Sequence, residues 1–459
     1  MIKIKVSILG LGYAGLVFAT CSAIRGFKVY GVDIDEERVK SIAKGIPPFY
    51  EAGLSELLFR AVHSKALIAT TDYRSAILNS DIIVIFVGTP TLPDGSCDLK
   101  HVRSACEMIG EVLKNASEYK LIVVRSTVPP GTTEEFVKPI IEHISGKVCG
   151  RDFGLCMCPE FIREGRAIED AFKPWRVIIG EYDEHSGNIF EKFYKTFLKE
   201  WKCPIIRTST YNAELVKYAS NAFLALKISF VNLIARVCEN IPKADIKVIA
   251  EGIGLDPRIG KLYLNAGLGF GGSCLPKDLK ALTKFINSLG IDTSLFRAIL
   301  NINESQVDHI IDMVKKGLGT YDLKDVTVSV LGLSFKPGTD DIRESQSIKL
   351  VKKLLSLGAR IKVHDPKALN KAKNMLKNTV EYCNDIYNCV KGAQAIIIAT
   401  DWPEYRLLDL EKTRKLVQYP LIIDARRVLD PVKVKEYGFK YFGVGLTQHV
   451  YYKNIPYEK

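Results

Sequence analysis

Long uninterrupted apolar runs are missing from this 459-residue sequence. A membrane-spanning helix needs about 20 consecutive apolar residues, and no stretch approaches that length. The apolar run nearest the start, Val6–Leu9, is cut at once by glycines, which is typical of a strand and not of a signal peptide. The sequence therefore predicts a cytoplasmic protein without a membrane partner.

The eleven cysteines include no C-x-x-C pair, and the seven histidines are scattered along the chain. Cys156 and Cys158 are one residue apart, which in a strand puts both side chains on the same face. Four sulfur ligands at zinc spacing cannot be assembled from neighbours here. We therefore expect no metal site, and we expect most cysteines to be small buried residues in a reducing compartment.

A basic tail is also missing, although the formal net charge is +12. Lysine and arginine are interspersed with aspartate and glutamate along the whole chain, and no aromatic-basic motif indicates RNA binding. We therefore expect no nucleic-acid partner. The excess positive charge instead suits ligands that carry pyrophosphate groups.

The chain is too long for one hydrophobic core, which indicates two or three domains. Up to about residue 206, apolar strands alternate with amphipathic helices, the pattern of a parallel sheet covered on both faces. A long helix is predicted over 211–240, and its wide apolar surface indicates burial between domains or subunits. Helices continue to about residue 316, broken by a glycine-rich loop at 267–272. The strands expected in the first part are Lys5–Leu9, Lys28–Val32, Ile82–Val87, Leu121–Val124 and Val177–Ile179.

The alternating pattern returns from residue 326 and echoes the beginning of the chain. The matching pairs are 328–333 with 6–11, 361–365 with 29–33, and 395–400 with 82–87. The sequence therefore predicts an α/β protein with two Rossmann-like, doubly wound parallel sheets, joined by a long central helix and a helical middle domain. The expected domains are 1–206, 207–317 and 318–459.

A glycine-rich segment follows the first expected strand: Gly10-Leu11-Gly12-Tyr13-Ala14-Gly15 matches G-x-G-x-x-G, and about 20 residues later a second strand ends in Asp33. Such glycines let backbone N–H groups approach a pyrophosphate at the start of a helix. The Asp33 carboxylate would accept a hydrogen bond from a ribose 2′-hydroxyl and repel a 2′-phosphate, so NAD is favoured over NADP. A glycine turn that only packs a strand on a helix is the alternative. The third domain has Ser334 where the first has Gly12, so we expect it to bind a different nucleotide ligand, or a different part of one.

The most informative stretch is 269–278, Gly-Phe-Gly-Gly-Ser-Cys-Leu-Pro-Lys-Asp. Cys274 follows a glycine-rich loop and has Lys277 and Asp278 close by, which fits an activated thiol. Taken alone, the segment fits a buried cysteine beside a tight turn equally well.

Two further polar clusters favour a catalytic site. Residues 159–165, Pro-Glu-Phe-Ile-Arg-Glu-Gly, pack charges directly after an apolar strand. On the long helix, Lys217 and Asn221 are four residues apart and share one face among apolar neighbours. A lysine there is costly unless it has a role or a partner, and a solvated position at the rim is the alternative.

Together these segments resemble the UDP-glucose/GDP-mannose dehydrogenase family, and the resemblance covers essentially the whole chain in the family's order. Two positions depart from the usual pattern: Cys158, where asparagine is common before Pro-Glu-Phe, and Ala14, where valine is usual. Neither touches a proposed catalytic group. The matching segments are the glycine fingerprint, Pro47–Leu54, 87–90, 125–129, Pro159–Glu164, Lys217 with Asn221, Gly269–Asp278, 335–337 and 341–345.

The resemblance implies an NAD-dependent enzyme that oxidises a nucleotide sugar twice, from alcohol to carboxylate. Cys274 would attack the aldehyde from the first oxidation, and oxidation of the resulting thiohemiacetal would give a thioester that water hydrolyses. Covalent capture explains how a reactive aldehyde is retained between two hydride transfers. The resemblance also implies that Lys217 and Asn221 support the oxyanion and transfer protons, with a water held by Asp278 and Thr127. Glu164 would assist thioester hydrolysis, and Glu160 would shape the site.

The resemblance also implies ligand contacts and a homodimer built on the long central helix. Arg258 matches an arginine that reaches the sugar pocket of the neighbouring subunit. The first domain would bind NAD, the second would carry the cysteine loop and the dimer contact, and the third would bind UDP. The implied cofactor contacts are Gly10, Gly12, Tyr13, Ala14, Gly15, Asp33, Arg38, Thr89, Thr127, Glu164 and Arg343. The implied substrate contacts are Phe161, Ile162, Arg163, Lys217, Asn221, Arg258, Tyr263, Phe270, Gly271, Phe335, Lys336 and Arg426.

The choice of sugar depends on the form of the cysteine segment. Gly-Ser-Cys-Leu-Pro-Lys-Asp resembles the UDP-glucose and GDP-mannose branches more than the branch that oxidises N-acetylated sugars. We therefore expect UDP-glucose to be converted to UDP-glucuronate, with GDP-mannose or a UDP-N-acetylhexosamine as alternatives.

Two rival classes are weighed against this one. An epimerase or dehydratase needs Tyr-x-x-x-Lys beside the cofactor, and that spacing occurs at 387–391, in the domain without the glycine fingerprint. A nucleotide-binding regulator that has lost catalysis has no physical reason to keep Cys274, Lys217, Asn221 and Asp278 together.

Overall fold

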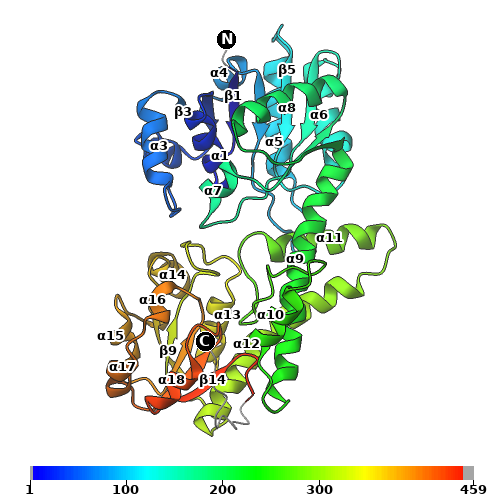
Figure 1. Cartoon of the computed structure of the whole chain (residues 1–459). Helices are drawn as coiled ribbons and strands as arrows, with labels where there is room; N and C mark the ends of the chain where they lie inside the picture. The colour runs from blue at the N-terminus through cyan, green and yellow to red at the C-terminus, as the bar shows by residue number, and fades with distance from the viewer. Residues whose placement is uncertain (1–3, 448–459) are drawn as a thin grey trace. The chain divides into compact units, whose positions relative to one another are not determined.

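The computed structural model describes residues 4–447 and separates into two compact units. Unit 1 comprises residues 1–220 and 280–291, and unit 2 comprises 221–279 and 292–459. Two of the three divisions fall inside helices, α9 (Thr210–Glu239) and α11 (Leu275–Ser288), and the third falls after residue 291, in the loop that follows α11. Figure 1 labels these elements along the chain.

Unit 1 is built on an eight-stranded sheet of order β3-β2-β1-β4-β5-β6-β7-β8, in which every pair is parallel except β6 with β7. Its strands are β1 Lys5–Leu9, β2 Lys28–Val32, β3 Leu67–Thr70, β4 Ile82–Ile85, β5 Lys120–Val124, β6 Phe153–Met157, β7 Val177–Glu181 and β8 Ile205–Ser209. Its helices, besides parts of α9 and α11, are α1 Tyr13–Ile24, α2 Glu36–Ala43, α3 Leu54–His63, α4 Tyr73–Leu78, α5 Lys100–Leu113, the π-helix η1 Thr132–Val137, α6 Lys138–Ser145, α7 Ala167–Phe172 and α8 Glu184–Leu198.

Strand β4 shows why the central strands are continuously apolar. Ile82 and Val84 pack into the core on one face of the sheet, and Ile83 and Ile85 pack into the core on the other. All four side chains are fully buried because helices cover both faces. An alternating polar pattern would leave one of these cores without its apolar lining.

Unit 2 contains a six-stranded, fully parallel sheet of order β11-β10-β9-β12-β13-β14. This order repeats that of the first six strands of unit 1, which confirms the predicted pair of Rossmann-like sheets. The strands are β9 Thr327–Leu331, β10 Arg360–His364, β11 Glu381–Tyr382, β12 Ala395–Ile398, β13 Leu421–Asp424 and β14 Lys440–Gly443. The further helices are α10 Ile246–Gly254, α12 Ser294–Leu318, α13 Gln346–Ser356, α14 Leu369–Leu376, the 3-10 helix η2 Lys377–Thr379, α15 Ile386–Val390, α16 Pro403–Arg406, α17 Leu410–Leu416 and α18 Pro431–Glu436.

Helix α9 is the long central helix that the sequence predicts. Within residues 4–447 it is the one helix whose length and composition would allow it to cross a membrane. Its buried polar side chains nevertheless form hydrogen bonds within the chain. Glu214 accepts from the backbone N–H groups of Gly131 and Thr133 in unit 1, and Asn232 accepts from that of Gly267 in unit 2. These contacts are those of a helix in a protein core.

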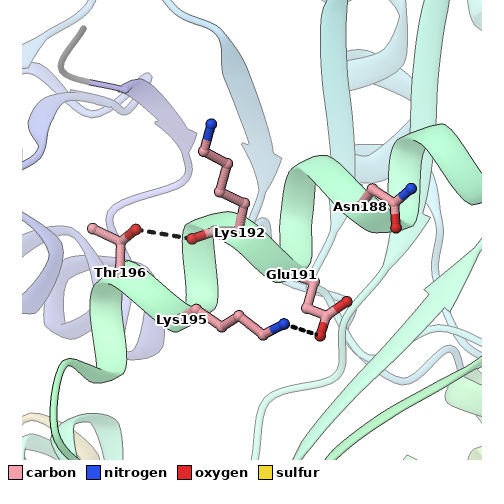
Figure 2. A pocket seen from close by; sticks show the side chains of 5 residues that line it. All are labelled: Asn188, Glu191, Lys192, Lys195 and Thr196. Atoms are coloured by element: carbon pink, nitrogen blue, oxygen red, sulfur yellow. Dashed lines mark hydrogen bonds and ion pairs between the residues drawn. The ribbon is translucent and has the colours of Figure 1, made fainter. Parts of the chain in front are cut away.

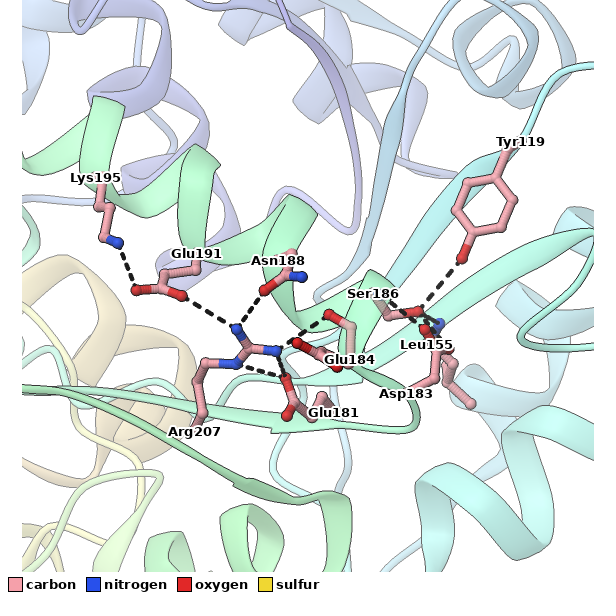
Figure 3. A network of polar contacts seen from close by, with 10 residues as sticks. All are labelled: Tyr119, Leu155, Glu181, Asp183, Glu184, Ser186, Asn188, Glu191, Lys195 and Arg207. Atoms are coloured by element: carbon pink, nitrogen blue, oxygen red, sulfur yellow. Dashed lines mark hydrogen bonds and ion pairs between the residues drawn. The ribbon is translucent and has the colours of Figure 1, made fainter.

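An ion-pair network fastens the edge strand β8 to β7 and α8 (Figure 3). The Arg207 guanidinium contacts Glu181 through Nε at 2.7 Å, Glu191 through Nη1 at 3.3 Å, and Asn188. Lys195 adds a second cation at 2.7 Å from Glu191. The network stabilises the end of the sheet beyond the antiparallel pair and contains none of the predicted site residues.

Candidate active site

The predicted cofactor residues, apart from Arg343 in unit 2, lie at or near the carboxyl ends of parallel strands in unit 1. Gly10 follows β1, Asp33 follows β2, Thr89 follows β4, and Thr127 follows β5, while the segment 158–164 follows β6. The strand order reverses between β1 and β4. In doubly wound sheets this edge and this reversal point form the ligand-binding crevice.

The three fingerprint glycines are required for different reasons. A Cβ on Gly10, whose φ is +102°, would lie 2.6 Å from the carbonyl oxygen of Phe86, and one on Gly15 would lie 2.0 Å from that of Gly10. A Cβ on Gly12 would meet no protein atom within 4 Å, so packing does not require glycine there. Gly12 precedes α1, whose first turn has no side-chain cap. The backbone N–H groups of the first turn of α1 therefore remain available to bind a pyrophosphate, as a dinucleotide-binding site requires.

Asp33 is held where a ribose-binding carboxylate is needed. Its Oδ2 accepts from the Leu11 N–H at 2.8 Å, and its Oδ1 accepts from Asp35 N–H at 3.0 Å and Arg38 Nη1 at 2.9 Å. The side chain is 6% exposed, while that of Arg38 is 35% exposed. The carboxylate keeps a lone pair for a ribose hydroxyl, and its negative charge disfavours a 2′-phosphate.

The other predicted cofactor residues of unit 1 lie in adjoining loops. The Tyr13 hydroxyl donates to Glu51, and Ala14 packs against the unit 1 core beside it. Thr89 Oγ1 donates to the carbonyl oxygen of Thr127 at 2.9 Å, which joins the loops after β4 and β5.

The loop that carries Glu160 and Glu164 is fixed at several points. The Glu160 carboxylate accepts the backbone N–H groups of Phe161 at 2.7 Å and Ile162 at 2.9 Å, and it pairs with the buried Arg125. Lys217, 7% exposed on α9, donates to the backbone carbonyl of Glu160, so it is not a solvated rim residue. Arg163 binds Asp170 through its backbone N–H and its guanidinium.

Cys158, the departure from the family pattern, lies behind this loop. Its sulfur accepts from Arg125 Nη1 at 3.2 Å and is 3.7 Å from the Tyr194 hydroxyl. Burial raises the pKa of this thiol, which therefore stays protonated at neutral pH. Cys158 thus helps to hold Arg125 and is unsuited to nucleophilic chemistry.

In unit 2, Cys274 stands apart from the other cysteines. Eight of the eleven are buried, Cys97 and Cys203 are half-buried, and Cys274 alone is exposed. It directly precedes α11, and its carbonyl accepts the Asp278 N–H at 2.8 Å as the helix begins. The peptide dipoles of the first turn stabilise negative charge on a sulfur at this position.

Asp278, one turn into α11, is 1% exposed and joins two predicted site residues. Its Oδ2 accepts from Asn221 Nδ2 at 2.6 Å, and its Oδ1 accepts from Lys277 Nζ at 2.6 Å. Two charge-assisted contacts keep this buried carboxylate in place. The structure thus brings Asn221 and Asp278 into contact.

The glycine loop before Cys274 packs against the segment after β9. Cβ atoms on Gly271 and Gly272 would lie 2.4 Å from the Glu344 carbonyl oxygen and 2.8 Å from the Phe335 ring, so only glycine allows this approach. The Gly272 N–H also donates to the carbonyl oxygen of Arg343 at 3.0 Å. Predicted substrate residues from two distant parts of the chain are thus brought together within unit 2.

The remaining predicted residues of unit 2 lie around this loop or on the surface. The Arg426 Nε donates to Ala399 O at 2.8 Å, and burial lowers the pKa of its guanidinium. Tyr263 has a positive φ of 66°, and Lys336 lies 5.5 Å from the Phe335 ring. Arg258 is the most exposed, with 87% of its side chain accessible and an ion pair to Asp256.

Several residues that position the site were given no role by the sequence. Asn303 accepts from the Phe270 N–H at 2.7 Å and donates to the Phe270 carbonyl at 3.0 Å, which clamps the glycine loop. Glu51 and Arg125 lie inside segments that carry the family resemblance, but only their contacts reveal what they hold. No local pattern could have identified Asn303, which lies in the interior of α12.

Other features of the described chain do not add a site. Among residues 4–447, no three His, Cys, Asp or Glu side chains converge as metal ligands. A surface hollow of about 500 Å³ is lined only by α8 residues, Asn188, Glu191, Lys192, Lys195 and Thr196 (Figure 2). Within the helix, Lys195 pairs with Glu191 and the Thr196 hydroxyl donates to the Lys192 carbonyl, while Asn188 and Glu191 also contact Arg207 of β8.

Comparison with known proteins matches three successive parts of the chain to one family. Residues 4–198 match the NAD binding domain of the UDP-glucose/GDP-mannose dehydrogenase family, 211–305 its central domain, and 329–431 its UDP binding domain. The match to the first of these domains confirms NAD as the cofactor.

Individual relatives agree over nearly full length. The UDP-glucose 6-dehydrogenase TuaD of Bacillus subtilis is 42% identical over 96% of this chain and 93% of its own. The structure of a UDP-glucose dehydrogenase from Pyrobaculum islandicum superposes with a TM-score of 0.89 at 40% identity, covering 97% and 98% of the two chains. A UDP-D-ManNAc dehydrogenase from Pyrococcus horikoshii gives 0.83 at 29% identity, covering 96% and 99%. The chain belongs to the UDP-glucose/GDP-mannose dehydrogenase family.

Proposed function

We propose that this protein is an NAD-dependent UDP-glucose 6-dehydrogenase that converts UDP-glucose to UDP-glucuronate by way of a covalent intermediate on Cys274. The observation that carries the proposal is that Cys274 is the one exposed thiol among eleven, at the start of a helix whose first turn bears Asp278. Identities near 40% to two UDP-glucose dehydrogenases, against 29% to a UDP-D-ManNAc dehydrogenase, favour UDP-glucose.

The proposed reaction balances as two oxidations and one hydrolysis. Two NAD molecules, bound one after the other, would each accept one hydride. The C6 alcohol would lose a hydride and a proton to give an aldehyde. The Cys274 thiolate would then add to the carbonyl carbon while the carbonyl oxygen takes up a proton, which gives a thiohemiacetal. Loss of a second hydride and a proton gives a thioester. Water then adds to the thioester, and the carbon–sulfur bond breaks to release the acid and the thiolate.

Two groups of residues would support the oxyanions and the proton transfers. Lys217 and Asn221 are four residues apart on α9, and both side chains are hydrogen-bond donors. They would donate to the developing oxyanion and stabilise it. Asp278, bound to Asn221, and Thr127 would hold the water that receives protons. Glu164 would assist the attack of water on the thioester, and Glu160 would shape the site through the backbone of its loop.

We assign the ligand contacts as the family pattern implies. Among the cofactor contacts, Asp33 would bind the ribose hydroxyl, with Arg38 beside it. The half-buried Arg426 has no carboxylate within ion-pair distance among the described residues, which suits a cation that meets an anionic nucleotide. The assigned cofactor contacts are Gly10, Gly12, Tyr13, Ala14, Gly15, Asp33, Arg38, Thr89, Thr127, Glu164 and Arg343. The assigned substrate contacts are Phe161, Ile162, Arg163, Lys217, Asn221, Tyr263, Phe270, Gly271, Phe335, Lys336 and Arg426.

A homodimer through α9 completes the proposal. Phe223, Leu226, Phe230, Leu233 and Val237 recur at alternating intervals of three and four residues, which is the spacing of a helix-packing seam. Four of the five are exposed in the single chain, as apolar residues that await a partner would be. The exposed Arg258 would then enter the neighbouring subunit's sugar pocket.

The family model ranges support a functional division into 1–206, 207–317 and 318–459, for NAD binding, for catalysis and dimerisation, and for UDP binding. We further propose that the enzyme works in the cytoplasm.

The sugar assignment is tested by NAD reduction with UDP-glucose, GDP-mannose, UDP-N-acetylglucosamine and UDP-N-acetylmannosamine, each at the same concentrations. UDP-glucose should give the highest kcat/KM. A higher value for any of the other three would overturn the assignment but not the family, while no reduction with any of them would refute the dehydrogenase function.

A further inference from the structure

The segment Pro47–Leu54 contains a buried carboxylate that the proposed mechanism does not use. Glu51 is 4% exposed and lies between the fingerprint loop and the loop that carries Glu164. Its Oε2 accepts from the Tyr13 hydroxyl and from the Gly165 N–H at 2.7 Å. Its Oε1 accepts from the Ala167 N–H at 2.8 Å. One carboxylate thus binds both the cofactor fingerprint and the residues directly after Glu164.

The surroundings of Glu51 are those of a positioning group and not of a structural ion pair. Among the described residues, no lysine, arginine or histidine lies within ion-pair distance of it. Its charge is balanced instead by three hydrogen-bond donors, which are stronger when the acceptor is ionised. Burial and the bond to Glu51 raise the pKa of the Tyr13 phenol, so the hydroxyl remains a donor.

The geometry of the loop makes these bonds decisive for Glu164. Gly165 has a φ of +79°, so the chain turns sharply directly after Glu164. On the other side, the Arg163 N–H donates to Asp170 Oδ2 at 2.9 Å. Glu164 therefore lies between two anchored N–H groups, that of Arg163 held by Asp170 and that of Gly165 held by Glu51. Loss of either anchor removes a hydrogen bond that fixes the backbone on one side of Glu164.

We infer that Glu51 is a positioning residue that sets the carboxylate of Glu164 for thioester hydrolysis and joins it to the cofactor loop through Tyr13. This inference rests on the proposed function of Glu164. It predicts that loss of Glu51 affects the last step of the reaction more than the two oxidations.

The test is Glu51→Gln in the full chain, followed at saturating NAD and UDP-glucose. The amide keeps the size of the side chain but turns an NH₂ group toward a backbone N–H, so one anchor is lost. Displacement by about 1 Å costs on the order of 10²-fold in rate. We expect a burst of two NADH per subunit, a slow steady phase, and an acyl adduct on the peptide that contains Cys274, seen by mass spectrometry. Glu164→Gln should show the same behaviour, and the double variant should be no slower than Glu164→Gln alone.

A second measurement does not depend on turnover. Amide hydrogen exchange of the 163–170 segment should be faster in Glu51→Gln than in the unmodified protein, without substrate present. Glu56→Gln is the matched control, since this exposed carboxylate on α3 has a single ion pair among the described residues, with Arg60 at 4.0 Å. It should change neither exchange nor rate.

Three results would overturn the role of Glu51: normal turnover in Glu51→Gln, unchanged exchange at 163–170, or an equal slowing of all steps without burst or adduct. Faster exchange at 163–170 in Glu51→Gln, combined with no adduct in Glu164→Gln, would support the role of Glu51 in holding the loop and refute the role of Glu164 in hydrolysis. Failure of the unmodified protein to oxidise UDP-glucose would count against the proposed function instead.

Discussion

Glu214 gives a quantitative prediction about pH, because it is a buried carboxylate on α9. It is fully inaccessible and accepts from the Gly131 N–H at 2.6 Å, the Thr133 N–H at 2.7 Å and Thr133 Oγ1 at 2.6 Å. These donors favour the ionised form, but burial outweighs them and raises the pKa from its ordinary 4.5 to about 7. Glu134, nearby, adds to the rise.

The folded state holds the Glu214 proton more tightly than the unfolded state, and this sets the direction in which stability changes with pH. Below pH 4.5 both states are protonated, so Glu214 imposes no penalty on the fold. Between 4.5 and about 7 the unfolded chain is ionised while the folded chain retains the proton, and stability falls as the pH rises. The rise of the pKa from 4.5 to about 7 corresponds to a total loss of roughly 3 kcal/mol of unfolding free energy, complete above pH 7.

The assay is chemical denaturation of the unmodified protein and of Glu214→Gln from pH 4.5 to 8, monitored by circular dichroism. Glutamine does not titrate, so the difference in unfolding free energy between the two proteins should change by roughly 3 kcal/mol across this range, with the unmodified protein losing stability toward high pH. A difference that is constant with pH would refute the reasoning. If the unmodified protein instead gained stability toward high pH, the three hydrogen-bond donors would lower the pKa of Glu214 by more than burial raises it.

Three further predictions follow from single contacts. Asp33→Ala removes the acceptor for the ribose hydroxyl and frees Arg38 for a 2′-phosphate, so the preference for NAD over NADP in kcat/KM should shrink by about 10–100-fold; equal use of both cofactors by the unmodified protein would contradict the assignment. Asn303→Ala leaves the backbone of Phe270 without its clamp, which should cost roughly 2–4 kcal/mol of stability in denaturation and lower kcat, whereas unchanged values would show that the loop holds itself. Phe230→Asp places a charge on the exposed α9 seam, so light scattering should report a monomer with intact circular dichroism; a persistent dimer would place the interface elsewhere.

The fold was predictable where strands are apolar on both faces. β1 and β2 have the predicted bounds, and the echo of the first part in the last appears as the same strand order. β4 ends two residues before the prediction because Phe86 and Val87 leave the sheet. The strands β3 and β8 were not anticipated, and β6 was expected only as an apolar strand before residue 159, without bounds. β3 and β8 are half-exposed edge strands, so their hydrophobic signal is weak.

The site was predictable as a set of segments but not as a set of contacts. The pairing of Lys217 with the Glu160 carbonyl, and of Asn221 with Asp278, joins residues 57 positions apart. Glu51 and Gly165 are 114 positions apart, and only the fold brings the carboxylate to that N–H group. The Cys158–Arg125 contact depends on the pairing of β5 with β6, which no local pattern contains.

The covalent relay at Cys274 is tested most directly by the number of NADH formed per UDP-glucose in a reaction run to completion with excess NAD. The account predicts two NADH and one acid, with no aldehyde captured by an added hydrazine. Cys274→Ser should lose activity by several powers of ten while it still binds the sugar nucleotide, and Cys203→Ser, a half-buried thiol away from the site, should turn over normally. One NADH per sugar, free aldehyde, or normal turnover by Cys274→Ser would contradict it.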